Sequence, residues 1–210
     1  MLENIEVLCH SSIKISKGKV IYIDPFKIDK NYNDADIIFI THDHYDHYSE
    51  EDIDKVRKSD TVIVAPEELL TKLLRKGFRQ NYIITIEPDE EDIVEGIKFE
   101  TIPAYNTNKQ FHPKENGWVG YIIELAGNRY YIAGDTDITE ENKKVKCDVA
   151  FVPVRRHIFY EVIASNYRRY NFNETIKWKR GIAMKFSNYI MSQSSKDIDK
   201  FSRKFSNILN

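Results

Sequence analysis

The chain has 210 residues, enough for one domain with a sizeable hydrophobic core and too few for two comfortable ones. Hydrophobic residues make up 41% and aromatic residues 12%, while glycine (8) and proline (6) are sparse, so collagen-like and wholly disordered chains are excluded. No run approaches the roughly 18 consecutive apolar residues of a membrane span, and residues 1–9 lack the pattern of a signal peptide. A globular protein of the cytoplasm, without a membrane partner, is therefore expected.

The charge is unevenly distributed along the chain. The whole sequence has 31 basic and 33 acidic side chains, a net charge of −2. Residues 1–154 carry 19 basic and 29 acidic side chains (net −10), whereas residues 155–210 carry 12 and 4 (net +8). A basic, aromatic-containing tail is compatible with nucleic-acid binding, but no RNA-binding motif accompanies it, so a solvated extension is favoured and no nucleic-acid partner is expected.

Short apolar runs separated by turn residues predict many strands. The runs at 5–9, 12–16 and 20–24, with a tight turn at Lys17-Gly18-Lys19, predict an antiparallel meander. Further strands are expected at 61–64, 82–86, 97–102, 121–125, 129–133 and 148–152. The chain is therefore expected to contain mostly short strands.

Two helices and one buried strand complete the prediction for the first half of the chain. Ser49 with Asp52 resembles a capping box that begins a helix through Arg57, and Pro66 begins a second helix that Gly77 ends. The continuous apolar run at 35–40 ends in a burst of polar residues, which is typical of a buried strand that leads into a functional loop. The fold class is therefore mixed α/β.

That polar burst is Thr41-His42-Asp43-His44-Tyr45-Asp46-His47, and it contains three of the six histidines. A chance HxHxDH match is expected in about one in a few thousand chains of this composition. Alternate residues at a strand end point the same way, so His42 and His44 can bind one ion, while Asp46 and His47 face a second. A solvated loop or a structural zinc site is the alternative, which is disfavoured because structural sites normally include cysteine.

The motif resembles the HxHxDH loop of the metallo-β-lactamase superfamily. Three more blocks are similar and occur in the same order: His10-Ser11-Ser12, the strand at 21–25 (IYIDP), and Ala133-Gly134-Asp135-Thr136. The chain resembles the small single-domain branch related to L-ascorbate-6-phosphate lactonase, over about residues 5–154. The resemblance implies an αββα sandwich, an α+β variant of the α/β class, whose C-terminal part is atypical or incomplete here.

The resemblance also implies the metal ligands. His42, His44 and His112 would bind the first ion, Asp46 and His47 the second, and Asp135 would bridge the two. His112 is the one histidine between the motif and Asp135, and an exposed loop histidine is its alternative.

Four further residues near these blocks are expected to support the site or to lie beside it. Asp24 is a candidate for orienting a ligand histidine, with a solvated turn residue as its alternative. His10 is a candidate for a supporting role or a core histidine. Asp43 is expected to point away from the ligands, and Asp137 to fix the loop after Asp135 or to face water.

These residues predict a metal-dependent hydrolase that uses a metal-bound hydroxide on a small ester, lactone or phosphodiester. Asp46 is the candidate catalytic residue, a ligand that also orients the water and takes its proton. Two divalent ions are expected, with zinc favoured and manganese or iron admissible. No GxSxG, P-loop or GxGxxG motif occurs, which disfavours serine hydrolases, NTPases and dinucleotide enzymes.

The resemblance breaks after the strand that ends at Val154. In the superfamily a later strand ends in a histidine that completes the second metal site, but here no histidine follows His157. Together with the change in charge, this divides the chain into a metallo-β-lactamase-like domain, 1–154, and a divergent basic segment, 155–210. Our hypothesis is that residues 155–210 derive from a shifted reading frame or an unrelated fusion, and helices are expected there at 161–167 and 194–209. The alternative function is a catalytically impaired metal-binding relative whose basic tail contacts nucleic acid or protein.

Overall fold

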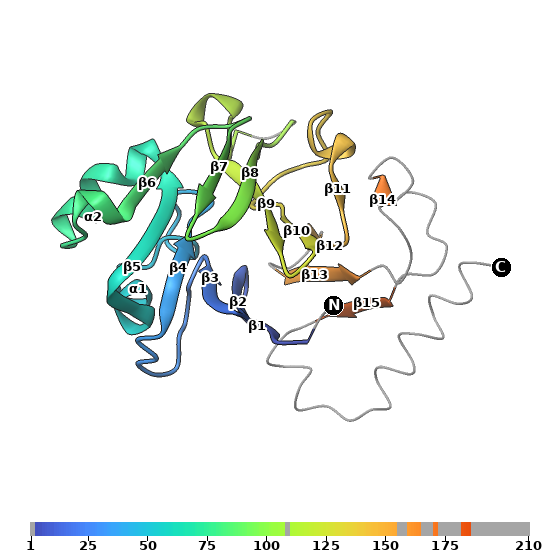
Figure 1. Ribbon diagram of the computed structural model, residues 1–210. Coiled ribbons are helices and arrows are strands. Elements are labelled where there is room, and N and C mark those ends of the chain that lie inside the picture. The colour runs from blue at the N-terminus through green and yellow to red at the C-terminus, as the bar shows by residue number, and fades with distance from the viewer. Residues whose placement is uncertain (1–2, 108–109, 155–158, 165–169, 172–181, 186–210) are drawn as a thin grey trace.

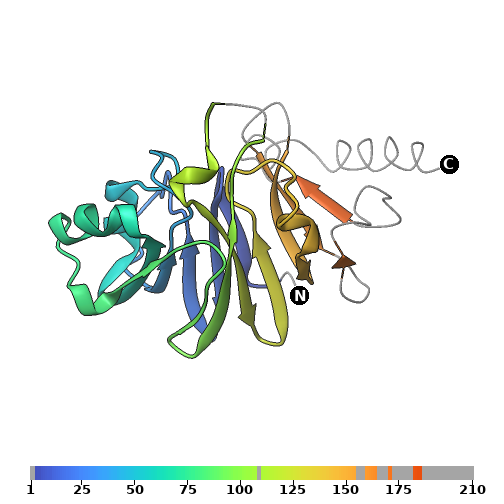
Figure 2. The ribbon, with the colours of Figure 1, turned by 90° about the horizontal axis from the view of Figure 1, so that it is seen from above.

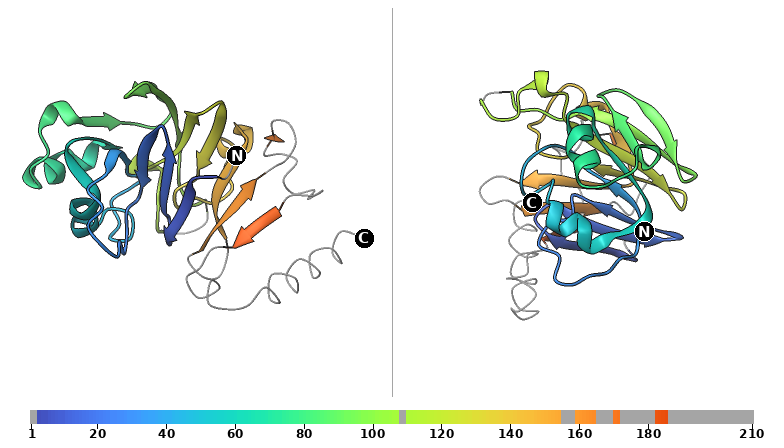
Figure 3. Two further views of the ribbon diagram at one scale, coloured as in Figure 1. Left: turned by 60° about the horizontal axis from the view of Figure 1, so that its bottom comes forward. Right: turned by 90° about the vertical axis from the view of Figure 1, so that its left-hand side faces the viewer.

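A computed structural model describes residues 3–107, 110–154, 159–164, 170–171 and 182–185 (Figure 1). Most of the described strands belong to two sheets that pack face to face (Figures 2 and 3). The mixed α/β class predicted from the sequence is confirmed, and the two packed sheets agree with the sandwich that the resemblance implies.

The first sheet has six strands in the order β1-β2-β3-β4-β5-β6. Their bounds are β1 Ile5–Cys9, β2 Ser12–Lys17, β3 Lys19–Ile23, β4 Ala35–Phe39, β5 Arg57–Pro66 and β6 Ile83–Ile86. The first three form the predicted antiparallel meander, and Gly18 adopts φ +77° in its second turn, where a side chain would strain the backbone. From β3 onward the strands run parallel, so their carboxyl ends share one edge of the sheet.

Two short helices cover the outer face of the first sheet, at one flank of Figure 1. Helix α1 spans Glu50–Val56, with Ser49 as its N-cap, as predicted. A 3-10 turn, η1 (Glu67–Leu69), leads into α2 (Leu70–Arg75), and Pro66 precedes the pair as predicted. Their apolar residues pack on the sheet through Ile53, Val56, Leu69 and Leu73.

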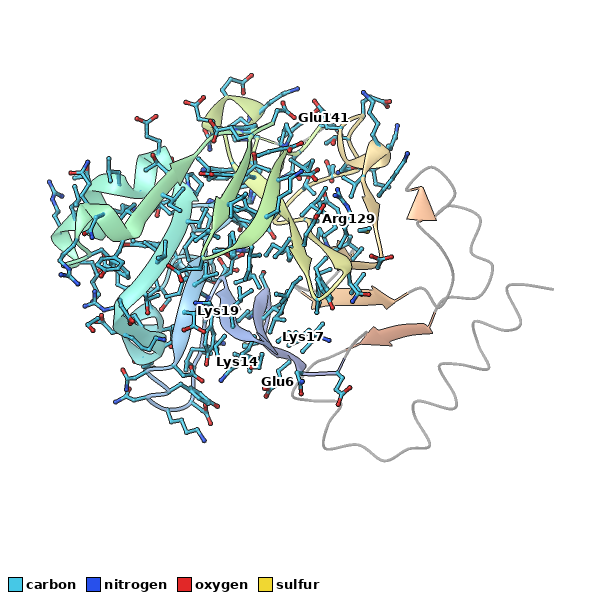
Figure 4. All side chains as sticks on the ribbon, viewed as in Figure 1. Glu6, Lys14, Lys17, Lys19, Arg129 and Glu141 are labelled. Atoms are coloured by element: carbon cyan, nitrogen blue, oxygen red, sulfur yellow. The ribbon has the colours of Figure 1, made fainter. Side chains whose placement is uncertain are left out.

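The second sheet has seven strands in the order β15-β13-β12-β10-β9-β8-β7. Their bounds are β7 Glu91–Val94, β8 Ile97–Pro103, β9 Val119–Leu125, β10 Asn128–Ile132, β12 Val149–Val154, β13 Phe159–Ala164 and β15 Ile182–Lys185. Two short strands, β11 (Lys146–Cys147) and β14 (Tyr170–Asn171), form a separate pair. Arg129 on β10, labelled in Figure 4, forms ion pairs with Glu124 on the adjacent strand β9 and with Glu100 on β8, the strand beyond it.

The main core lies between the two sheets and is rich in isoleucine and aromatic residues. Phe39 of β4 meets Phe99 and Tyr121 of the second sheet, with ring centroids 5.4 and 4.9 Å apart. The hydroxyl of Tyr121 donates a 2.6 Å hydrogen bond to the carbonyl of Ile40. The second sheet therefore fixes the end of β4, where the histidine motif begins.

The second sheet buries its other face under shorter elements. Ile122, Tyr131, Val145 and Cys147 pack there. The 3-10 turns of the described residues are η2 (Gln80–Tyr82), η3 (Lys114–Asn116) and η4 (Asn142–Lys144), besides η1.

Two differences from the sequence prediction have physical causes. Strand β7 has a single buried residue, Val94, so its acidic sequence gave no apolar signal. The helix predicted over 161–167 is wrong for its first four residues. Residues 159–164 form β13 instead, which pairs antiparallel with β12 and gives β12 a second neighbour besides β10. The helix predicted at 194–209 lies outside the described residues.

Candidate metal centre

Asp24 organises the start of the motif from the end of β3. Its Oδ1 accepts a hydrogen bond from the Thr41 backbone N–H (2.8 Å), and its Oδ2 accepts one from the Thr41 hydroxyl (2.7 Å). The same Oδ2 lies 2.7 Å from Nδ1 of His47. Asp24, Thr41 and His47 are all fully buried, so this network holds the two ends of the histidine motif together away from water.

Three histidine rings meet at the mouth of this loop. The ring centroids of His42 and His44 are 4.7 Å apart, and His112 lies 4.9 Å from the first and 4.7 Å from the second. One ring nitrogen of each lies within 4.8 Å of the others. His42 and His112 are buried and His44 is half-buried, so three imidazoles converge on one point.

A second donor group shares His42 with the first and adds His47 and Asp135. Asp135 faces both groups, because its Oδ1 lies 3.6 Å from Nε2 of His47 and its Oδ2 lies 3.6 Å from Nε2 of His112. Asp46 lies beside them, with Oδ2 3.9 Å from Nε2 of His47. The structure therefore brings together all six residues that the sequence nominated as ligands.

Gly134 allows Asp135 to lie close to His47 and His112. Gly134 has φ +63°, and a Cβ there would lie 3.0 Å from the Val119 carbonyl oxygen and 3.3 Å from Cβ of Thr41. A larger residue would be strained in this conformation and would push the loop away from the motif. The glycine thus places an acidic side chain opposite the histidines.

The loop that carries His112 is tied to the loop after Asp135. The Asn106 backbone N–H donates to the carbonyl of His112 (2.8 Å), and Asp137 accepts a hydrogen bond from the backbone of Thr107 (3.0 Å). Asp137 therefore fixes this loop, one of the two roles expected for it. His112 itself has φ +59°, a left-handed conformation that this loop imposes.

Burial and neighbouring groups set the charge of the histidines. Burial, with the adjacent histidines, lowers the pKa of His42, and burial also lowers the pKa of His112 against the opposing effect of Asp135. Burial alone would lower the pKa of His47, but the Asp24 carboxylate more than offsets this and raises it. His42 and His112 are thus held neutral at pH 7, the form in which imidazole binds metal.

The donor set fits divalent metal ions. Imidazole nitrogens with carboxylate oxygens are ligands that zinc, manganese and iron accept. Among the described residues, no group hydrogen-bonds to the buried Nδ1 of His112, and Nε2 of His42 lies only 3.1 Å from Nδ1 of His44. Buried polar atoms without a partner are rare in proteins, so this concentration of donor atoms favours a cation between them.

Two other nominated residues have different contacts, and two residues beside the histidines were missed. The ring of His10 packs on Phe26, with centroids 5.5 Å apart, and Asp43 points outward to Lys72 (2.5 Å). Ser11 and Trp118 contact the histidines but were not nominated. Ser11 lies in the His10-Ser11-Ser12 block of the resemblance, whereas no sequence spacing links Trp118 to the motif, and only the fold brings it there.

Comparisons with known proteins show the family to which the chain belongs. The model of a family described as "Beta-lactamase superfamily domain" matches residues 8–180, which extends beyond Val154. A UPF0173 metal-dependent hydrolase of Ligilactobacillus salivarius is 30% identical over 160 residues, 69% of each chain. A similar relative of Anoxybacillus flavithermus is 29% identical over 164 residues, 69% of this chain and 70% of its own.

Solved structures show the same architecture. A candidate metal-dependent hydrolase from Parabacteroides distasonis is 34% identical, with a TM-score of 0.62 over 73% of this chain and 70% of its own. Igni18, a metallo hydrolase of Ignicoccus hospitalis, shares the fold at 22% identity, with a TM-score of 0.57 over 73% of this chain and 71% of its own. The chain therefore belongs to the β-lactamase superfamily, in the branch whose curated relatives are named metal-dependent hydrolases.

No helix in the described part of the chain combines the length and the hydropathy needed to cross a membrane. His157, the last histidine of the sequence, lies outside the described residues.

Proposed function

We propose that this protein hydrolyses a small ester, lactone or phosphodiester at the metal centre formed by the histidine motif, His112 and Asp135. The observation that carries the proposal is the pair of donor groups that share His42, with one carboxylate oxygen of Asp135 facing each group. Two divalent ions, zinc in the first place, and a cytoplasmic location belong to the same proposal.

Each donor group would hold one ion. His42, His44 and His112 would hold the first, and His47 with Asp46 the second, with Asp135 between them. Ions bound there would supply an acidified water and polarise the oxygen of the attacked carbonyl or phosphoryl group.

In this proposal, side chains of the protein orient the attacking water and a ligand histidine, and one of them accepts a proton. Asp46 is buried beside His47, which supports the proposal that its carboxylate orients the attacking water and accepts its proton. Asp24 faces Nδ1 of His47, which keeps the opposite nitrogen, Nε2, directed toward Asp135. Burial of this network excludes bulk water from the protein side of the site.

One observation favours the alternative, an impaired relative that binds metal without turnover. The second donor group contains one histidine that the first group does not, His47, and within the described ranges no histidine follows His112. The ligand that the superfamily takes from its closing strand has no counterpart there, and a second ion would have fewer protein ligands.

A turnover assay separates the two functions. The full chain is stripped with a chelator, reloaded with zinc, manganese or iron, and offered a nitrophenyl ester, a lactone and bis(nitrophenyl) phosphate. The proposal predicts turnover that requires metal and that falls at least about a hundredfold in His42→Ala. Glu67→Ala, an exposed change on η1, is the control. Metal binding without turnover of any of the three substrates would support the impaired relative instead.

A further inference from the structure

Trp118 packs against all three histidines of the first donor group. The centroid of its indole lies 4.8 Å from the rings of His42 and His44 and 4.9 Å from the ring of His112. The first contact is tilted by 38°, and the other two are edge contacts at 74° and 73°. Trp118 is 7% exposed, so the orientation of one buried ring constrains three candidate ligands.

Glu68 on η1 accepts a hydrogen bond from the indole of Trp118. The indole Nε1–H of Trp118 donates a 2.5 Å hydrogen bond to Oε1 of Glu68, which lies on η1, 50 residues earlier in the chain. A buried indole N–H requires an acceptor, and a carboxylate makes a stronger bond than a neutral group. The bond leaves the indole plane little freedom to rotate.

The same segment contacts the motif a second time. Lys72 follows Glu68 by four residues, one helical turn, and its Nζ lies 2.5 Å from Oδ2 of Asp43. Asp43 stands between His42 and His44 in the chain. The segment from η1 to α2 therefore makes two contacts near the histidines. Its Lys72 pairs with Asp43 of the histidine motif, and its Glu68 accepts the hydrogen bond from the indole of Trp118.

We propose that Glu68 is a positioning residue of the metal site, acting through Trp118. Its carboxylate fixes the indole, and the indole fixes the rotamers of the three histidines before metal arrives. Ligands that are held in place by packing bind metal more tightly than ligands that must be ordered on binding. The inference rests on the proposed function, because it assumes that His42, His44 and His112 bind a metal ion.

The test is a titration of the metal-free full-length protein with Co²⁺, followed by the visible absorption of the bound ion. Glu68→Ala is expected to raise the Kd for Co²⁺ about threefold to tenfold and to alter the absorption band, which reports ligand geometry. Glu68→Gln is expected to stay within about twofold of the parent, because its amide oxygen still accepts the indole N–H.

Two further variants test the route through the indole. Trp118→Phe keeps an aromatic ring but has no N–H, so its Kd is expected to match that of Glu68→Ala. The double variant is expected to be no weaker than either single variant, because both remove the same bond. Glu67→Ala, on the same turn, is the matched control, and chemical unfolding of each metal-free variant verifies that it is folded.

The outcomes distinguish a failure of the role of Glu68 from a failure of the proposed metal-dependent function. Co²⁺ binding by Glu68→Ala that equals the parent, or losses that add in the double variant, would overturn the role of Glu68 and leave the metal site standing. A parent protein that binds no Co²⁺ would overturn both.

Discussion

Nδ1 of His47 lies 2.7 Å from Oδ2 of Asp24, and neither side chain is exposed to solvent. The pair joins the end of β3 to the far end of the histidine motif, 23 residues away. Because the same carboxylate also accepts two hydrogen bonds from Thr41, one buried charge sets the orientation of a candidate ligand and of the strand end that carries the others.

Asp24→Asn is therefore expected to weaken zinc binding about tenfold to a hundredfold while the fold is retained. The amide oxygen can still accept from Thr41, but the charge that faces His47 is lost. Competition with a chromophoric chelator measures the affinity. Asp29→Asn, an exposed change on the same connection, serves as control. Equal affinities for Asp24→Asn and the parent would show that the pair has no part in metal binding.

Gly120 lies on β9 where the end of β10 leaves no room for a side chain. A Cβ there would lie 2.6 Å from the carbonyl oxygen of Ile132 and 2.8 Å from that of Ala133, both backbone atoms. Gly120→Ala is expected to lower the free energy of unfolding by about 2 to 4 kcal/mol, measured by urea denaturation.

Gly127→Ala is the matched control for this change. Gly127 lies in the turn between β9 and β10 with φ +74° and open space around it, so only backbone strain of about 1 kcal/mol is expected. A larger loss for Gly127→Ala than for Gly120→Ala would contradict the packing of the second sheet.

Glu141 joins the loop that carries His112 to the loop that follows Asp135. Its side chain lies 2.6 Å from Nζ of Lys114 and accepts a 2.9 Å hydrogen bond from the hydroxyl of Tyr105. The Lys114 ammonium is the main reason that the pKa of Glu141 falls from 4.5 to about 2. A lowered carboxyl pKa stabilises the fold above pH 4.5, and this stabilisation is lost as the pH falls toward 2.

Glu141→Gln is accordingly expected to lower stability at pH 7 by about 0.5 to 1 kcal/mol, and the difference from the parent should shrink between pH 4.5 and 2. Urea denaturation of the metal-free proteins at several pH values measures it. Glu140→Gln, whose residue is exposed and pairs with Lys143, is the comparison. A difference that stays constant with pH would mean that Glu141 carries no such charge interaction.

Much of the fold was predictable because its signals are local. The apolar runs, the Ser49 cap and the turn at Gly18 act over a few residues, and the structure confirms the elements that they predicted. Strand β7 was missed because one buried residue gives no alternating pattern. The pairing of β13 with β12 depends on a distant edge, which local propensity does not report.

The residues of the candidate site likewise fall into those that local sequence predicts and those that it does not. His42, His44 and His47 stand in one motif, so their chemistry is visible in the sequence. Contacts such as Trp118 with Glu68 join residues 50 positions apart, and no spacing rule reveals them. The assignments of His112 and Asp135 drew on resemblance rather than spacing, and their metal-binding roles stay a prediction.

The most direct test of this account is the metal content of the full-length protein, purified without added metal and measured by plasma mass spectrometry beside a His42→Ala, His44→Ala variant. About two ions per chain are expected in the parent, and both are expected to be lost in the variant because His42 belongs to both donor groups. A parent without bound metal, or a variant that retains as much metal as the parent, would contradict it.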